Sequence, residues 1–245
     1  MAVGNTFVVN KVCPVCGQST RVVKVRSRLI TTKTDSDFCA YYKDFNPYFY
    51  AIWVCEHCGY AADEKHFLSV MPERHKQAIQ AFLDGRTIGF KFVEERGLPE
   101  AVASFKLAIF YAEMIKAPLA HQAGLSLELA WLFRFSGESE KEVPLLQHVI
   151  DLYDESLMSE RYPIGMLTDT MVIYLIGALY YRLGDIEKAT QYLSRIISDN
   201  DSRIQERKLY EKARNLWQDI RAAREKQRAE ARSETDRVMA AARQK

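Results

Sequence analysis

The sequence predicts a mainly α-helical protein with a small β module at its N-terminus. Two Cys-x-x-Cys pairs and a stretch of alternating apolar and polar residues lie before Pro72, which is typical of short strands around a metal site. After Pro72 the apolar residues recur every three or four positions, as on one face of a helix. We expect a zinc-ribbon-like module over 1–71, a helical domain of tetratricopeptide-like hairpins over 72–223 and a basic helical tail over 224–245.

Composition narrows the classes of function. With 48% hydrophobic residues among 245, the chain can bury a substantial core. A formal net charge of +2 gives no global field that would favour nucleic acid or a membrane surface. The first residues lack the pattern of a signal peptide, and the longest nearly apolar stretch, Met171–Tyr181, is too short to cross a bilayer. We expect a cytoplasmic protein without a membrane partner.

Two strands are expected in the N-terminal module. Residues 21–30 alternate, with Val23, Val25 and Leu29 on one face. The opposite face carries Lys24, Arg26 and Arg28. A second strand is expected over 48–54, leading into the second cysteine pair.

The helical part is divided by Pro118, Gly137, Pro163 and Gly184. A helix is expected from Pro99, with an apolar face of Val102, Phe105, Ile109 and Ala112. The helices expected after it cover residues 121–135, 141–154, 168–183, 185–198 and 203 into the tail. Short breaks between them predict antiparallel hairpins.

One of these hairpins has the spacing of a tetratricopeptide unit. The matching residues are Ile176, Gly177, Tyr180, Gly184, Ala189, Leu193 and Ile196. In such a unit small residues let two helices approach and large residues fill the remaining space. The first half of the pattern recurs more weakly at Leu129, Ala130, Phe133 and Gly137. A generic helical bundle is the alternative, because one good unit does not prove an array.

The cysteines carry the strongest chemical signal. Cys13 and Cys16 form one Cys-x-x-Cys-Gly turn, and Cys55 and Cys58 form the other. Each turn can point two thiolates at one ion, and a tetrahedral zinc ion needs four such ligands. The alternative is a pair of redox-active or unmetallated thiols. We expect one structural zinc ion per chain, with an enlarged hairpin or an inserted helix in the 38 residues between the pairs.

Four cysteine ligands close the coordination sphere, so no position remains for a reactive water. This argues for a structural rather than a catalytic ion. His57 and His66 are weaker candidates to replace a ligand. Cys39 is interpreted as a buried small apolar residue.

The run DSDFCAYYKDFNPYFYAIWVCEHCGYAA, together with CPVCG, resembles the bacterial domain-of-unknown-function family 2225. The later segments LELAWLFR, YLIGALYYRL and ARNLWQDIR are similar to the helical motifs of that family. The resemblance implies an N-terminal double Cys-x-x-Cys module joined to a helical body. The resemblance implies no particular activity.

Other polar and aromatic residues between the cysteine pairs have two interpretations. Asp35 and Asp37 are expected to cap a turn rather than to act as paired catalytic carboxylates. The aromatic residues are expected to be buried against the neighbouring domain rather than to stack on bases. They are Tyr41, Tyr42, Tyr48, Tyr50 and Trp53.

The last helix has an apolar stripe that ends at Ala223, after Leu209, Ala213, Leu216 and Ile220. Beyond it, Arg224, Arg228 and Arg232 repeat every four residues. With Lys24, Arg26 and Arg28 they are the candidate contacts for nucleic acid or an acidic partner. The preferred interpretation of the tail is a solvated extension.

The leading functional hypothesis is a non-enzymatic zinc-binding adaptor whose hairpins bind a protein or peptide. The second is a zinc-containing nucleic-acid-binding protein, with weak binding that is lost at physiological salt. The third is an enzyme without recognisable motifs. The chain has no nucleotide-binding loop, nucleophile elbow or zinc-protease helix.

Overall fold

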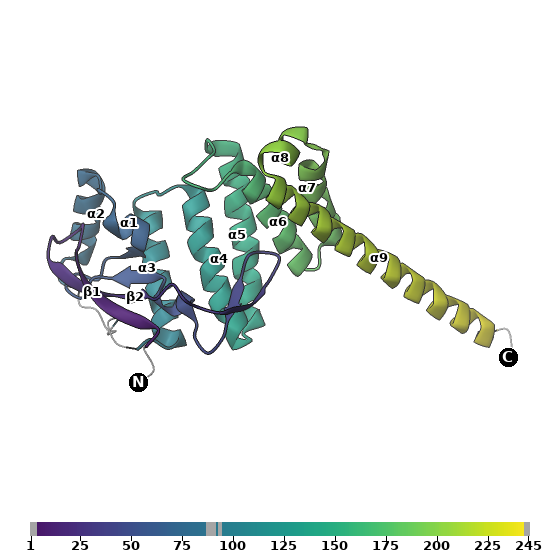
Figure 1. Ribbon diagram of the computed structural model, residues 1–245, viewed down its shortest axis with the longest axis horizontal. Coiled ribbons are helices and arrows are strands. Elements are labelled where there is room, and N and C mark those ends of the chain that lie inside the picture. Colours follow the sequence, from purple (N-terminus) through teal and green to yellow (C-terminus); the bar gives the residue numbers. More distant parts are fainter. Residues whose placement is uncertain (1–3, 87–91, 93–94, 243–245) are drawn as a thin grey trace. The chain divides into compact units, whose positions relative to one another are not determined.

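The computed structural model describes residues 4–86, 92 and 95–242, with side chains described as far as Glu225. The chain forms two compact units, Met1–Glu160 and Arg161–Lys245. The described residues are mainly α-helical, with short antiparallel strand pairs confined to the N-terminal part (Figure 1). The expected fold class is therefore confirmed.

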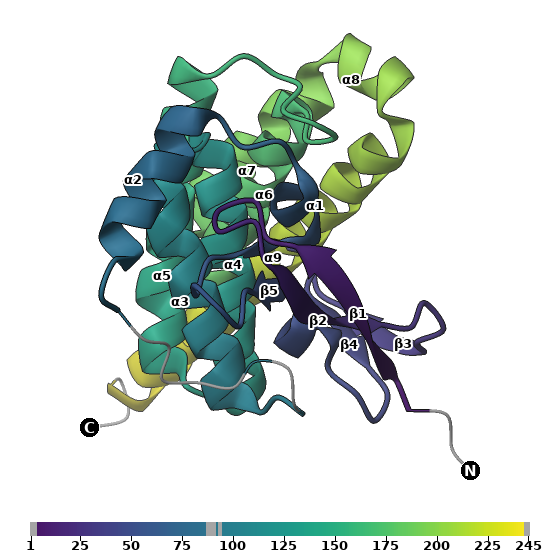
Figure 2. The same ribbon diagram turned by 90° about the vertical axis from the view of Figure 1, so that its left-hand side faces the viewer.

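Unit 1 begins with three two-stranded antiparallel sheets among the described residues. The long pair joins β1 (Thr6–Val12) to β2 (Ser19–Val25), and Figure 2 shows this hairpin. The other pairs join β3 (Thr31–Thr34) to β4 (Ala40–Tyr42), and β5 (Ile52–Val54) to β6 (Ala61–Asp63).

Both expected strands are shorter in the structure. The first ends at Val25, so Arg26 and Arg28 lie in the following loop. In the second, Pro47–Tyr50 is a 3-10 turn, and only Ile52–Val54 is a strand. Pro47 favours the turn because its φ angle is fixed, and the side chain of Asn46 accepts a hydrogen bond from the Tyr48 N–H at 3.0 Å.

The helices of unit 1 follow the strands. They are α1 (Glu64–Leu68), α2 (Glu73–Leu83), α3 (Leu98–Met114), α4 (Leu119–Ser136) and α5 (Ser139–Ser159). Gly137 ends α4 in the left-handed conformation, and α5 begins two residues later, so the two helices form the expected hairpin. On α3 the fully buried stripe runs through Ala101, Phe105, Ala108 and Ala112, while Val102 and Ile109 lie at its edge.

The N-terminal module and the helices that follow it share one hydrophobic core. Trp53, Tyr60 and Phe67 belong to the same buried cluster as Phe105 on α3 and Leu129 on α4. The division of the chain therefore differs from the expected boundary at residue 71. A module with such short strands has too little apolar surface for a core of its own, so it is completed by α3 and α4.

Unit 2 contains α6 (Asp169–Arg182), α7 (Ile186–Ser198), α8 (Asn200–Gln205) and α9 (Arg207–Ala242). Helix α9 continues past α6 and α7 (Figure 1). The expected single helix from residue 203 is wrong at its start, because Glu206 separates α8 from α9. The predicted stripe on α9 is buried at Leu209, Ala213, Leu216 and Ile220.

The hairpin α6–α7 packs closely at Gly177. A Cβ atom added there would lie 3.0 Å from Cγ of Leu193 and 3.4 Å from Cβ of Tyr192. Both partners are on α7, so the missing side chain is what lets the helices approach. The close approach of two helices at a small residue, expected for this hairpin, is therefore present at Gly177. Among the described residues, no helix is both long and apolar enough to cross a membrane.

Candidate metal centre

Each Cys-x-x-Cys pair forms the tip of a β-hairpin. The first lies between β1 and β2, and the second between β5 and β6. The two tips repeat the same backbone pattern: the Gly17 N–H donates to the Cys13 carbonyl at 3.0 Å, and the Gly59 N–H donates to the Cys55 carbonyl at 2.9 Å. Both glycines have positive φ angles, 73° and 81°, which side chains disfavour. The sequence Cys-x-x-Cys-Gly thus determines the turn.

The two tips bring the four sulfur atoms together. Sγ of Cys13 lies 3.7 Å from Sγ of Cys58, and Sγ of Cys16 lies 3.7 Å from Sγ of Cys55. A tetrahedral ion with bonds of about 2.3 Å to sulfur separates its ligands by about 3.8 Å. A disulfide would need about 2.05 Å, and none of the five cysteines is in a disulfide. The four cysteines therefore form a cluster that can hold a metal ion.

The electrostatics of the cluster favour a cation. The pKa of the Cys13 thiol is raised to about 12, first by its hydrogen bond with Cys55 and also by burial. The pKa of Cys58 is raised as well, by its hydrogen bonds with Cys13 and Cys55, whereas the hydrogen bonds with Cys13 and Cys58 lower the pKa of Cys55. Neighbouring sulfurs cannot all be ionised without a positive charge between them, and a bound metal supplies that charge.

Several contacts fix the position of the two hairpin tips relative to each other. Arg21 on β2 forms an ion pair with Glu56 at 3.2 Å, and its backbone N–H donates to the same carboxylate at 3.1 Å. The Glu56 N–H donates to the buried hydroxyl of Thr20 at 3.0 Å. From α2, the side-chain amide of Gln80 donates to the Val15 carbonyl at 2.7 Å. The geometry of the sulfur cluster therefore depends on both hairpins and on α2.

The remaining cysteine and His57 lie outside the cluster. Cys39 is fully buried, as expected for a small apolar residue. The Nε2 atom of His57 lies 2.9 Å from the Ser19 carbonyl oxygen, so this ring contacts the backbone of the first tip and is not one of the clustered ligands.

His66 belongs to a second cluster, which sequence reasoning missed. Its Nδ1 lies 2.6 Å from Oδ2 of Asp63, and Nε2 of His121 lies 3.7 Å from the same oxygen. The two imidazole rings face each other with centroids 3.8 Å apart. The Asp-x-x-His spacing at the start of α1 was a visible signal, but His121 comes 55 residues after His66 on α4, and only the fold brings them together.

The charges in this second cluster are set by burial. The pKa of His121 is lowered to about 4, first by burial and then by the nearby His66, so its imidazole is neutral at physiological pH. Burial opposes ionisation of Asp63, but the hydrogen bond from His66 outweighs it, and the pKa of Asp63 is lowered. Burial, and then the charge of Asp63, raise the pKa of Glu128 on α4 to about 7.

The predicted basic contacts that the structure describes have different surroundings. Nζ of Lys24 is paired with Glu64 at 2.7 Å, and Nε of Arg26 donates to the Gly4 carbonyl at 2.9 Å. Arg28 and Arg224 are exposed. Arg228 and Arg232 lie in the part of α9 whose side chains are outside the described residues. Binding by these residues stays a prediction.

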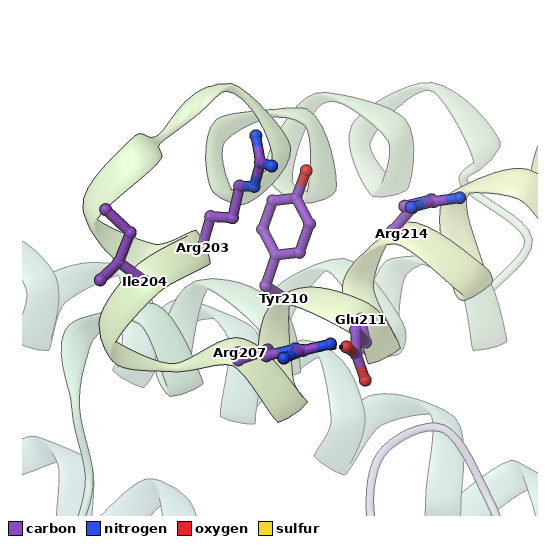
Figure 3. A pocket seen from close by; sticks show the side chains of 6 residues that line it. All are labelled: Arg203, Ile204, Arg207, Tyr210, Glu211 and Arg214. Carbon is purple, nitrogen blue, oxygen red and sulfur yellow. Dashed lines mark hydrogen bonds and ion pairs between the residues drawn. The ribbon is translucent and has the colours of Figure 1, made fainter.

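A different group of arginines lines a cavity of about 500 Å³ in unit 2. Arg203 and Ile204 come from α8, and Arg207, Tyr210, Glu211 and Arg214 come from α9 (Figure 3). Arg207 pairs with Glu211 at 2.9 Å. The lining therefore contains three guanidinium groups and one carboxylate. The other three residues of α9 follow Arg207 by three, four and seven positions, which places all four on one face of the helix. This spacing was a signal in the sequence that could have revealed the cavity lining.

The acidic and aromatic residues between the cysteine pairs are structural. Nη2 of Arg134 on α4 lies 2.7 Å from Asp37, and Nη1 lies 3.1 Å from Asp35. Asp37 also accepts a hydrogen bond from the Cys39 N–H at 3.4 Å, so turn capping is a minor part of its role. Tyr48 packs edge-on against Trp131 of α4, with centroids 5.2 Å apart. Burial of the aromatic residues, rather than a free stacking face, is the better interpretation.

The fold and the sulfur cluster define a class: a mainly helical protein with an N-terminal four-cysteine module that can hold a metal ion. Residues 9–220 match the family described as "Uncharacterized protein conserved in bacteria (DUF2225)", and the chain belongs to this family. Neither the comparison with curated proteins nor that with solved structures finds a match.

Proposed function

We propose that the protein is a non-enzymatic adaptor in which one zinc ion stabilises the N-terminal module and the C-terminal helices bind an acidic peptide or protein segment. Zinc is supported by the donor set, since four thiolates at tetrahedral spacing suit this ion. Such a site is closed, which favours a structural role over catalysis. A tetratricopeptide-like hairpin over α6–α7 and a cytoplasmic location belong to the same proposal.

The observation that carries the binding role is the arginine-lined cavity. Arg203, Arg207 and Arg214 surround it, and the single carboxylate of Glu211 offsets only part of their charge. Guanidinium groups bind carboxylates through paired, charge-assisted hydrogen bonds. Tyr210 and the exposed side chain of Ile204 add apolar surface. A segment with acidic and apolar side chains would complement this lining.

The test is fluorescence anisotropy with a labelled peptide rich in Glu and Leu at physiological salt. Replacing Arg203, Arg207 and Arg214 by Gln should weaken binding at least about tenfold, because a hydrogen bond to a charged group contributes about 1.5 kcal/mol or more. The control replaces Arg28, Lys208 and Arg224, which are exposed and outside the cavity. It removes the same charge and should bind normally.

Two outcomes would contradict the proposal. Equal binding of a neutral peptide would show that the arginines do not select the ligand. Tight binding of single-stranded DNA at physiological salt, lost in the control triple variant, would favour the nucleic-acid alternative. We expect DNA binding to be weak and to fall steeply between about 50 and 200 mM salt.

A further inference from the structure

The cluster of Asp63, His66 and His121 has the composition of a second metal site, separate from the cysteines. Among the described residues these are the side chains of a second group whose ligand atoms all lie within 4.8 Å of one another. Two imidazoles and one carboxylate form the donor set of many zinc and iron sites with three protein ligands. We propose that Asp63, His66 and His121 bind a divalent first-row transition-metal ion such as zinc.

The carboxylate of Asp63 is oriented for such a role. Its Oδ1 accepts the His66 backbone N–H at 3.1 Å, which caps α1. This contact fixes the side chain and leaves Oδ2 directed at both imidazoles, 2.6 Å from one and 3.7 Å from the other. Ligands of a tetrahedral ion with bonds near 2.1 Å are about 3.4 Å apart, so the two distances bracket the value required.

Binding requires small local changes. The short hydrogen bond between His66 and Asp63 must open slightly as the ion replaces the shared proton. The rings of His66 and His121 lie beside each other, with centroids 3.8 Å apart and planes tilted by 31°, and both rings must rotate about their side-chain bonds to direct one nitrogen each at the ion.

A small cavity adjoins the two histidines. Its volume is about 30 Å³, and its lining includes His66, His121, Tyr60 and Tyr111. One water molecule needs about 10–15 Å³. A metal bound by three protein side chains would therefore have space for one or two waters or a small anion. In this respect the site differs from the closed four-cysteine cluster. The proposal adds a binding site and assigns no reaction.

The alternative is a purely structural contact between stacked histidines, and metal titration distinguishes the two. Full-length protein with its cysteine site filled is titrated with Zn²⁺, and the imidazole signals are followed by NMR. The proposal predicts uptake of one further ion per chain, with shifts of the His66 and His121 signals. The signals of His57, His75 and His148 serve as internal controls, since these residues lie outside the cluster.

The matched variants are His121→Gln and His75→Gln. The first should lose the second ion and keep the ion bound by the cysteines, which also reports that the module is folded. The second should bind both ions. Absence of a second ion in the wild type, or uptake without effect on the two rings, overturns the proposal. The wild-type signals decide the question even if His121→Gln does not fold.

Discussion

Arg134 is the residue that ties the segment between the cysteine pairs to α4. Its guanidinium contacts Asp35, Asp37 and Glu142, and only 4% of its side chain is exposed. The indole N–H of Trp131 donates to Asp37 at 3.1 Å, so the buried carboxylate is well hydrogen-bonded. Removing one member of such a group leaves an uncompensated buried charge, which is far more costly than losing an exposed ion pair.

We therefore expect Arg134→Met to lower the free energy of unfolding by about 3–5 kcal/mol. Urea denaturation of the full chain is the measurement. The control is Lys141→Met, which removes an exposed ion pair with Glu138 and should leave the stability nearly unchanged. If both variants lower the free energy of unfolding by similar amounts, the contacts of Arg134 stabilise the fold no more than an exposed ion pair does.

Asp35 should make the stability depend on acid pH. Burial raises its pKa, but hydrogen bonds from Lys33 and Tyr41 and the charge of Arg134 outweigh that effect, so its pKa is lowered. The stabilisation is present above the unfolded pKa of about 4 and is lost as the pH falls through the lower folded pKa. Asp35→Asn should be less stable than the wild type at pH 7, and urea unfolding should show the difference shrinking near pH 3. A constant difference would contradict this assignment.

At the scale of elements, the close contact between α6 and α7 is the feature that the sequence pattern predicted best. Gly177 has Leu193 and Tyr192 at contact distance, whereas a Cβ atom at Gly124 on α4 would meet no atom within 4 Å. The two glycines can therefore be compared by the same substitution. Gly177 is required by the packing of α6 against α7, whereas Gly124 only weakens its own helix.

Gly177→Ala should destabilise the protein by about 1–3 kcal/mol, because the added methyl group overpacks the hairpin. Gly124→Ala should be neutral or stabilising by up to about 1 kcal/mol, because alanine favours a helix. Thermal and urea unfolding measure both. If Gly177→Ala is as stable as the wild type, α6 and α7 can move apart without loss of stability, and the close contact does not stabilise the fold.

The sequence predicted well those elements that are determined by residues close together in the chain. The Cys-x-x-Cys-Gly turns, the α4–α5 break at Gly137 and the stripe on α9 could be read from neighbouring residues. The 3-10 turn at Pro47 was missed, although Asn46-Pro47 is a turn signal. The cluster around His121 and the contacts of Arg134 with Asp35 and Asp37 could not be predicted, because these partners lie 55 or more residues away and meet only through tertiary packing.

At the scale of the whole molecule, the shared hydrophobic core determines which fragments of the chain can fold by themselves. Phe105 and Leu129 are buried against Trp53, Tyr60 and Phe67 of the N-terminal module. A fragment beginning at Pro72 would expose this surface. The expected domain boundary at residue 71 followed from the helical periodicity, which does not show what covers each helix.

We expect a fragment of residues 1–160 to fold cooperatively in the presence of zinc. A fragment of residues 72–245 should lose cooperative unfolding of α3, α4 and α5, because the residues of the N-terminal module that complete their core are missing. Circular dichroism during urea titration checks both fragments. A cooperative, fully helical 72–245 fragment would restore the boundary at residue 71.

Elemental analysis tests the proposed zinc ion at the four cysteines. Protein purified without chelator and dialysed against metal-free buffer should retain one tightly bound zinc ion per chain. Replacing Cys13, Cys16, Cys55 or Cys58 by Ser should release this ion and loosen the module, because metal binding contributes folding free energy. Cys39→Ser should keep it. Wild-type protein that contains no zinc, or a Cys13→Ser variant that still holds it, would contradict the account.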